Sequence, residues 1–170
     1  MNFLIVTGLS GAGKSMAVNA LEDIGFFCID NIPAGLLPRI LDFAQQGENQ
    51  LSRVAVVMDI RGLHSVQETN EALEALDEKK MPYDILFLDA SDAAIRRRYK
   101  ETRRVHPMTI SEGIPVSEAI TKERQILQPL RERAKYVIDT SLLSTAQNRV
   151  RVSGRVLDIG QCARWLHVVW

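Results

Sequence analysis

The segment Gly8-Leu9-Ser10-Gly11-Ala12-Gly13-Lys14-Ser15 decides the fold of this chain. It fits the pattern G-x-x-x-x-G-K-[ST], follows the short apolar run Phe3–Thr7 and precedes a segment with helical spacing. Its glycines let the backbone bend so that several N–H groups point at phosphate oxygens. The positive N-terminal end of the following helix strengthens this attraction. The segment therefore predicts a phosphate-binding loop between a strand and a helix.

The loop also predicts a ligand, a nucleoside triphosphate with Mg²⁺. Lys14 reaches the β- and γ-phosphates, and the Ser15 hydroxyl ligates the metal. Asp59, at the end of a later apolar run, is the best candidate for a second carboxylate near the metal. Asp30 is the runner-up for that role, or a substrate-side carboxylate. The residues expected to bind the nucleotide are Gly8, Leu9, Ser10, Gly11, Ala12, Gly13, Lys14 and Ser15. The base is not specified, because the sequence lacks a guanine-reading Asn-Lys-x-Asp motif.

Five short apolar runs are continuous rather than alternating, which is typical of strands covered on both faces of a parallel sheet. They are Phe3–Thr7, Phe26–Asp30, Val54–Asp59, Ile85–Asp89 and Tyr136–Asp139. Helical segments alternate with them, so we expect a doubly wound α/β domain with helices on both faces of a parallel sheet. Several runs end in Asp, and such sheets bind ligands outside the carboxyl ends of their strands. Some of these carboxylates should face the ligand, whereas Asp89 is expected to cap the next helix.

Turn and capping signals predict where the helices begin and end. Gly25 is placed to end the first helix, and Pro38 requires the second helix to begin close to it. The candidates for later N-caps are Ser65, which forms a capping-box pair with Glu68, Ser91 and Ser117.

A basic cluster precedes a segment rich in turn-forming residues. The cluster is Arg96, Arg97, Arg98, Lys100, Arg103 and Arg104. Arg96, Lys100, Arg103 and Arg104 share one helical stripe, which must be exposed or face a ligand. Three roles remain open: a lid whose Arg103 or Arg104 stabilises charge on the transferring phosphoryl group, a strip for RNA phosphates, or a solvated face. The cluster leads into Arg104–Val116, a predicted loop in which His106 is expected to be polar surface.

Composition narrows the class of protein. The chain has 170 residues, with Lys+Arg 21 and Asp+Glu 21, so its length predicts one domain and its charge argues against nucleic-acid binding by bulk charge alone. Cys28 and Cys162 are too few for a disulfide framework, and no zinc spacing is present. No targeting segment or apolar run of membrane length is found, so we expect a cytoplasmic protein.

After Ser141 the composition changes, which indicates either a last helix and an edge strand or a segment foreign to the domain.

Several segments found in order along the chain point to one family. They are Ile5–Ser15, Asp30-Asn31-Ile32-Pro33, Asp59-Ile60-Arg61-Gly62, Phe87-Leu88-Asp89-Ala90, Arg98–Pro107, Glu123-Arg124 and Val137–Ser141. Together they closely resemble the RapZ/YvcJ family of bacterial P-loop nucleotide-binding proteins, also called RNase adapter proteins. The phosphate loop is generic, whereas Asp-Asn-Ile-Pro and Glu-Thr-Arg-Arg-x-His-Pro are specific. The resemblance covers residues 1–141, and residues 142–170 are expected to form a tail that departs from the family pattern.

The resemblance implies a P-loop NTPase with a fold like the small P-loop kinases, which binds ATP and GTP and hydrolyses them weakly. It assigns Gly8–Ser15 to ATP and Asp59, Ile60, Arg61 and Gly62 to GTP. The resemblance implies that family members carry a C-terminal domain linked to RNA binding and amino-sugar phosphate sensing, and we do not expect residues 1–170 to include such a domain. RNA is therefore a partner that the resemblance implies for the full-length family.

Three functions remain open, and the resemblance favours the first. A regulatory NTPase should lose nucleotide binding in Lys14→Ala and hydrolyse slowly without an acceptor. A small-molecule kinase would use a carboxylate such as Asp30 to accept a substrate hydroxyl proton. An RNA-binding adapter should bind RNA with a steep salt dependence whether or not Lys14 is intact. The oligomeric state is not specified by the sequence.

Overall fold

The structure is a computed structural model that describes residues 2–46, 51–58, 63–142, 144, 147 and 150–154. Its centre is a parallel sheet of five strands, in the order β2-β3-β1-β4-β5. The strands are β1 (Asn2–Gly8), β2 (Phe27–Ile29), β3 (Arg53–Val57), β4 (Asp84–Asp89) and β5 (Tyr136–Asp139). All five predicted strands are thus confirmed, and the parallel pairing agrees with their continuous apolar sequences.

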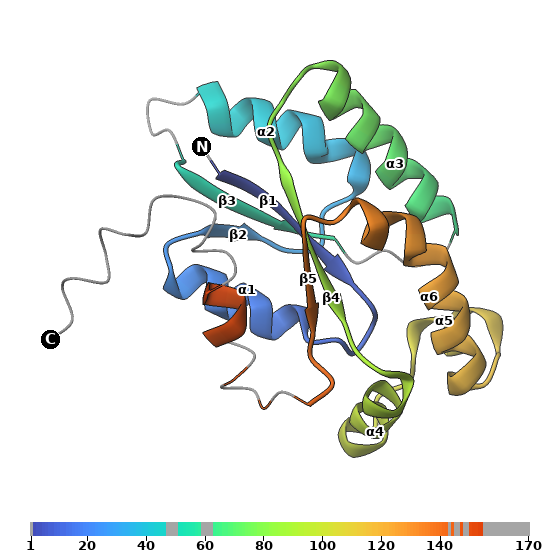
Figure 1. The fold of residues 1–170 in the computed structure, drawn as a ribbon. Helices are drawn as coiled ribbons and strands as arrows, with labels where there is room; N and C mark the ends of the chain where they lie inside the picture. Colours follow the sequence, from blue (N-terminus) through green and yellow to red (C-terminus); the bar gives the residue numbers. More distant parts are fainter. Residues whose placement is uncertain are drawn as a thin grey trace, which may run out of the picture.

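Helices cover both faces of this sheet, as predicted (Figure 1). They are α1 (Lys14–Asp23), the short 3-10 helix η1 (Ala34–Leu36), α2 (Leu37–Gln46), α3 (Leu63–Glu78), α4 (Asp92–Thr102), α5 (Pro107–Glu112) and α6 (Val116–Arg133). Figure 1 shows α1 on one face and α2, α3 and α6 on the other, with α4 and α5 beyond the carboxyl ends of β1 and β4. The chain thus crosses the sheet repeatedly and places its phosphate loop at the end of the central strand.

Three of the predicted helix signals are confirmed. Helix α2 begins at Leu37, so Pro38 lies in its first turn, as expected. Gly25, with φ +86°, ends α1: its N–H donates to Glu22 O at 3.0 Å, and the Phe26 N–H donates to Leu21 O at 3.0 Å. This pair of bonds is the Schellman arrangement, which requires a left-handed residue and therefore favours glycine. At the start of α4 the Ser91 hydroxyl accepts the Ala94 N–H at 3.2 Å, as an N-cap serine should.

Three other boundary predictions are wrong. Ser65 lies inside α3, which begins at Leu63, and its carbonyl accepts the Thr69 hydroxyl at 2.6 Å. Helix α6 begins at Val116 after Pro115, so Ser117 is inside it. The segment Arg104–Val116 is not a continuous loop either, because α5 occupies its Pro107–Glu112 part. At α5 and α6 a proline stands before or in the first turn, where its missing N–H costs nothing, and at α6 this preference outweighed the signal of Ser117.

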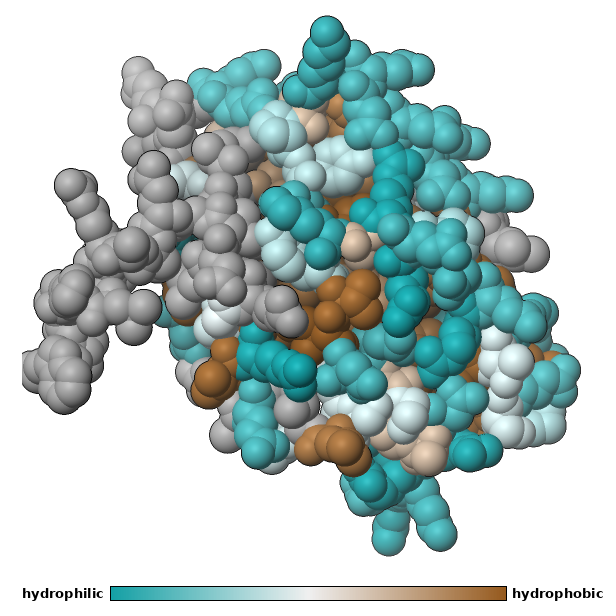
Figure 2. All heavy atoms as spheres, in the orientation of Figure 1, coloured by the Kyte–Doolittle hydropathy of each residue, from teal (hydrophilic) through white to brown (hydrophobic). Residues whose placement is uncertain are grey.

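The core lies between the sheet and its helices. Residues of the central strands are almost fully buried, among them Val6, Val56 and Leu88. Figure 2 shows mainly hydrophilic residues on the face seen there, with smaller apolar areas between them. Residues 150–154 are helical and extend this packing: Val152 is fully buried, and the Ser153 hydroxyl donates to Ala20 O of α1 at 3.4 Å. Within the described residues, no helix is long and apolar enough to cross a membrane.

Candidate phosphate-binding site

The phosphate loop is bent by its glycines. Gly8, Gly11 and Gly13 have φ values of +144°, +83° and +99°, in the range that favours glycine. The Ala12 N–H donates to Leu9 O at 3.0 Å, which closes the turn. The Lys14 ammonium donates to Gly8 O at 2.9 Å and to Leu9 O at 3.2 Å, so it lies across the loop. The loop thus has the bent path and the cation that the sequence predicts.

Gly8 is required by a close approach of β1 to β4. A Cβ atom at this position would lie 2.1 Å from Leu88 O, far inside contact distance. The Leu9 N–H donates to the same carbonyl at 3.1 Å, which fixes the loop to the neighbouring strand. The glycine at the first position of the motif is therefore a packing requirement as well as a conformational one.

Arg98 of α4 stabilises the phosphate loop by hydrogen bonds from its guanidinium group. Its Nη1 donates to Gly11 O at 2.9 Å and to Thr140 Oγ1 at 3.1 Å, and its Nη2 donates to Thr140 O. Thr140 in turn donates its hydroxyl to Ala12 O at 2.9 Å. Burial lowers the pKa of Arg98, helped by the neighbouring Arg97, but an arginine stays protonated at physiological pH. Arg98 was not among the predicted site residues, although it belongs to the basic cluster and lies off the exposed stripe.

Glu123 of α6 is buried beneath the loop. Its Oε2 accepts the Ser10 N–H at 3.0 Å, and its Oε1 accepts the Ser10 hydroxyl at 2.6 Å. Oε2 also lies 3.1 Å from His106 Nε2. Only 3% of Glu123 is exposed, which is rare for a carboxylate without partners. A signal was present in the sequence, because Glu123 falls on the apolar face of its helix with Ile120 and Leu127.

His106 is not polar surface, contrary to the expectation. Its ring is fully buried, it caps α5 by accepting the Met108 N–H on Nδ1 at 3.2 Å, and its centroid lies 5.4 Å from that of Tyr99. The partner that makes burial possible, Glu123, is distant in the sequence. Pro107 at the first helical position was the local signal of a helix start.

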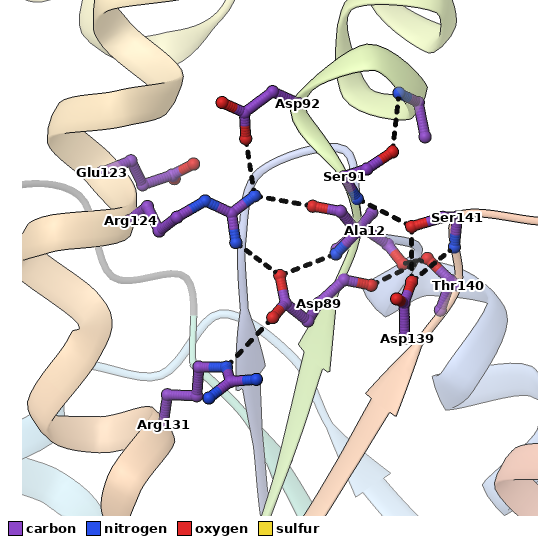
Figure 3. Close-up of polar contacts among 12 residues, drawn as sticks. Ala12, Asp89, Ser91, Asp92, Glu123, Arg124, Arg131, Asp139, Thr140 and Ser141 are labelled. Carbon is purple, nitrogen blue, oxygen red and sulfur yellow. Dashed lines mark hydrogen bonds and ion pairs between the residues drawn. The ribbon is translucent and has the colours of Figure 1, made fainter.

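Asp89 forms an ion-pair network instead of capping the next helix, so that expectation is wrong (Figure 3). Its Oδ1 accepts from Ala90 N and from Arg124 Nη1, each at 2.8 Å, and its Oδ2 accepts from Arg131 Nε at 3.0 Å. Arg124 Nη2 also donates to Asp92 Oδ1 at 2.7 Å. These contacts join the end of β4 to α4 and α6, so Asp89 stabilises the arrangement of elements beside the loop.

The other candidate residues lie in different environments. Ser15, Arg103 and Arg104 are exposed, and Asp30 is exposed at the end of β2. Arg103 has φ +53° at the end of α4. The other stripe residues, Arg96 and Lys100, are exposed as well. The segment Asp59-Ile60-Arg61-Gly62 lies outside the described residues.

The Asp139 carboxylate also makes local bonds. Its Oδ1 accepts the Ser141 N–H at 2.8 Å and the Ser141 hydroxyl, and these bonds lower the pKa of Asp139.

In the described part of the chain, no group of three or more His, Cys, Asp or Glu side chains could hold a metal ion. The bent loop and the Lys14 ammonium supply N–H donors and positive charge, which suit an anion.

The chain matches proteins of known family and fold. The model of the RapZ-like N-terminal domain matches residues 1–158, which extends beyond the end of the resemblance at residue 141. A nucleotide-binding protein of Alkaliphilus oremlandii is 44% identical over 159 residues, covering 91% of this chain and 54% of that protein. Another, of Agathobacter rectalis, is 46% identical over 152 residues, covering 89% and 52%. The chain thus spans about half the length of the curated relatives it matches.

A solved structure shows the same fold at low sequence identity. Shikimate kinase from Acinetobacter baumannii, in complex with shikimate, matches with a TM-score of 0.61 and 16% identity over 93% of this chain and 94% of that one. The fold is accordingly that of the P-loop kinases, as predicted. With the family model covering most of the sequence, the chain belongs to the RapZ-like family through that family's N-terminal domain.

Proposed function

We propose that this chain binds ATP and GTP with Mg²⁺ at the loop Gly8–Ser15 and hydrolyses them slowly, in a regulatory role. The observation that carries the proposal is the bent loop, whose three left-handed glycines lead into α1 with Lys14 across its mouth. The names of the curated relatives and the P-loop kinase fold support it. Hydrolysis and the regulatory role follow from the family resemblance.

The loop fits the phosphates of a nucleotide on two observations. Gly13 is the N-cap of α1 and has no side chain, so it leaves the first-turn amides open to an anion. Lys14 donates to two loop carbonyls, and a phosphate oxygen is a stronger acceptor for an ammonium than a carbonyl is. In the proposal Lys14 turns from these carbonyls to the β- and γ-phosphates.

The residues proposed to hold the metal are Ser15 and Asp59. The Ser15 hydroxyl is exposed at the start of α1, beside the loop. A bound Mg²⁺ neutralises charge on the phosphate oxygens. Arg103 and Arg104, both exposed after α4, are proposed to approach the transferring phosphoryl group, and Ile60, Arg61 and Gly62 to contact GTP.

Calorimetric titration with ATP and with GTP, with and without Mg²⁺, tests the proposal. We expect saturable binding by the wild type and by Lys79→Ala, which removes an exposed ammonium that pairs with Asp42 at 3.7 Å, away from the loop. Lys14→Ala should bind at least about tenfold more weakly, because it loses a charge-assisted bond to phosphate. No heat from the wild type, or equal losses in both variants, would refute the proposed binding.

Phosphate release in the same samples separates hydrolysis from transfer. We expect slow release without any acceptor, whereas a small-molecule kinase would release little. Asp59→Asn should reduce Mg²⁺-dependent turnover more than nucleotide binding without metal. An equal reduction of both would show that Asp59 is not near the metal.

A further inference from the structure

A buried pair of side chains links the phosphate loop to the segment that carries Arg103 and Arg104. Glu123 makes two hydrogen bonds to Ser10 of the loop, one to its amide and one to its hydroxyl. The same carboxylate contacts His106, which lies two residues beyond Arg104. Both partners are buried, Glu123 to 3% exposure and His106 completely. A hydrogen bond to a carboxylate in such a place is strong and geometrically restrictive.

The two nitrogens of His106 have different tasks. Nδ1 accepts the Met108 N–H at 3.2 Å, so it carries no proton. The proton is therefore on Nε2, which donates to Glu123 at 3.1 Å. One nitrogen caps α5, and the other connects the start of α5 to the phosphate loop through Glu123.

The near end of the same segment is also attached to the loop. Arg98 of α4 donates to Gly11 O, and the Tyr99 ring lies 3.2 Å from the point where a Cβ of Gly11 would be. Tyr99 contacts the His106 ring as well. The exposed residues Arg103 and Arg104 are thus held between two attachments to one loop.

We propose that Glu123 and His106 are positioning residues that hold Arg103 and Arg104 in register with the phosphate loop. The proposal rests on the proposed function, because its consequence is the approach of these arginines to the γ-phosphate. Movement of the loop on nucleotide binding then passes through Ser10 and Glu123 to His106. Neither Glu123 nor His106 needs to touch the nucleotide.

Two variants of His106 separate the link from the cap. In His106→Asn the amide oxygen lies near the position of Nδ1, so the cap of α5 is kept and the donor to Glu123 is lost. In His106→Gln the amide nitrogen lies near the position of Nε2, so the donor is kept and the cap is lost. If His106 only stabilised α5, the two variants would differ only because His106→Asn keeps the cap and His106→Gln loses it.

Trypsin cleavage after Arg103 and Arg104, in the absence of nucleotide, tests whether the contact between His106 and Glu123 holds this segment in place. We expect His106→Asn to be cleaved there about tenfold faster than the wild type, because the far end of the segment opens more often. His106→Gln should be cleaved at a rate near that of the wild type. Mass spectrometry assigns the cut sites. Faster cleavage of His106→Gln than of His106→Asn would overturn the proposal.

Triphosphate affinity then tests the consequence in a double-mutant cycle with Arg103→Ala/Arg104→Ala. We expect His106→Asn to raise the Kd of the otherwise wild-type chain by about tenfold and to leave that of the arginine-free chain unchanged. Equal effects in both backgrounds would overturn the proposal. Absence of binding by the wild type would refute the proposed function instead, while the cleavage rates would still decide whether the link exists.

Discussion

Replacing Gly8 by alanine tests whether the phosphate loop is held against β4 as closely as the structure indicates. The added Cβ would lie 2.1 Å from Leu88 O and 2.7 Å from Leu88 N, whereas real Cβ contacts are essentially never below 3.0 Å. Both atoms belong to the backbone of a central strand, so neither can rotate away. The end of β1 must therefore move from β4 by about 0.9 Å, the difference between 3.0 and 2.1 Å.

The expected cost is the sum of three contributions. A displacement of that size breaks the 3.1 Å bond from Leu9 N to Leu88 O, which is worth about 1 kcal/mol. Forcing a side chain into the close contact costs about 1–3 kcal/mol, and holding alanine at φ +144° costs about 1–3 kcal/mol more. The total of about 3–7 kcal/mol is a large part of the usual stability of a domain, which is about 5–15 kcal/mol.

Two other glycines supply matched controls. Gly25 has φ +86°, but a Cβ there meets no atom of the described residues within 4 Å, so Gly25→Ala carries only the conformational cost of about 1–2 kcal/mol. Gly35 lies in η1, where φ is negative, and its Cβ position is equally open among the described residues. Gly35→Ala should be neutral or stabilise by about 0.5 kcal/mol.

Urea unfolding followed by far-UV circular dichroism gives the three differences. With a slope of about 2 kcal/mol per molar urea, Gly8→Ala should lower the midpoint by at least about 1.5 M and Gly25→Ala by about 0.5–1 M. A Gly8→Ala midpoint equal to that of Gly25→Ala would show that the close approach to β4 is absent and that only the conformation of Gly8 matters.

Three further predictions concern single side chains. Arg98→Ala removes the bonds to the loop and to Thr140 and should destabilise the fold by about 1–2 kcal/mol in urea unfolding; an unchanged midpoint would contradict this. Burial, reinforced by nearby carboxylates, raises the pKa of Cys28 to about 11, so at pH 8 iodoacetamide should alkylate it more slowly in the folded chain than in urea, as peptide mapping would measure. The bonds from Ser141 lower the pKa of Asp139, so this stabilisation is present at neutral pH and is lost as the pH falls through the folded-state pKa. Ser141→Ala should raise that pKa towards the ordinary value in an NMR titration. The variant also loses the bond from the Ser91 N–H to the Ser141 hydroxyl at 2.7 Å, which does not depend on pH, so its loss of stability should be larger at neutral pH than below that range.

The strands could be predicted because each is buried on both faces and therefore continuously apolar. The helix starts were harder, because a serine signals an N-cap only where no stronger local preference competes. Ser91 has no such competitor, whereas Pro107 and Pro115 set the starts of α5 and α6. Local sequence thus fixes an element more reliably than its first residue.

In the candidate site, too, one part could be predicted from the sequence and another could not. The phosphate loop is one contiguous segment whose residue types are dictated by its chemistry, so the sequence alone could predict its bend. Glu123 contacts Ser10, and His106 contacts Glu123. These partners are far apart in the chain, and no local pattern gives the identity of such a partner. A carboxylate on an apolar helix face was nevertheless a usable signal, because burial of an unpaired charge is costly.

The basic cluster shows why a run of charge need not have one function. Successive residues of α4 point in directions about 100° apart, so Arg98 faces the loop while Arg96 and Lys100 are exposed. An alanine scan across the cluster would therefore mix two effects: loss of a structural contact at Arg98 and loss of surface charge elsewhere. Ligand binding by the exposed stripe can be tested only in variants that keep Arg98. Charge reversal at Arg96 and Lys100 meets this condition, because it inverts the surface potential without removing a hydrogen bond to the loop.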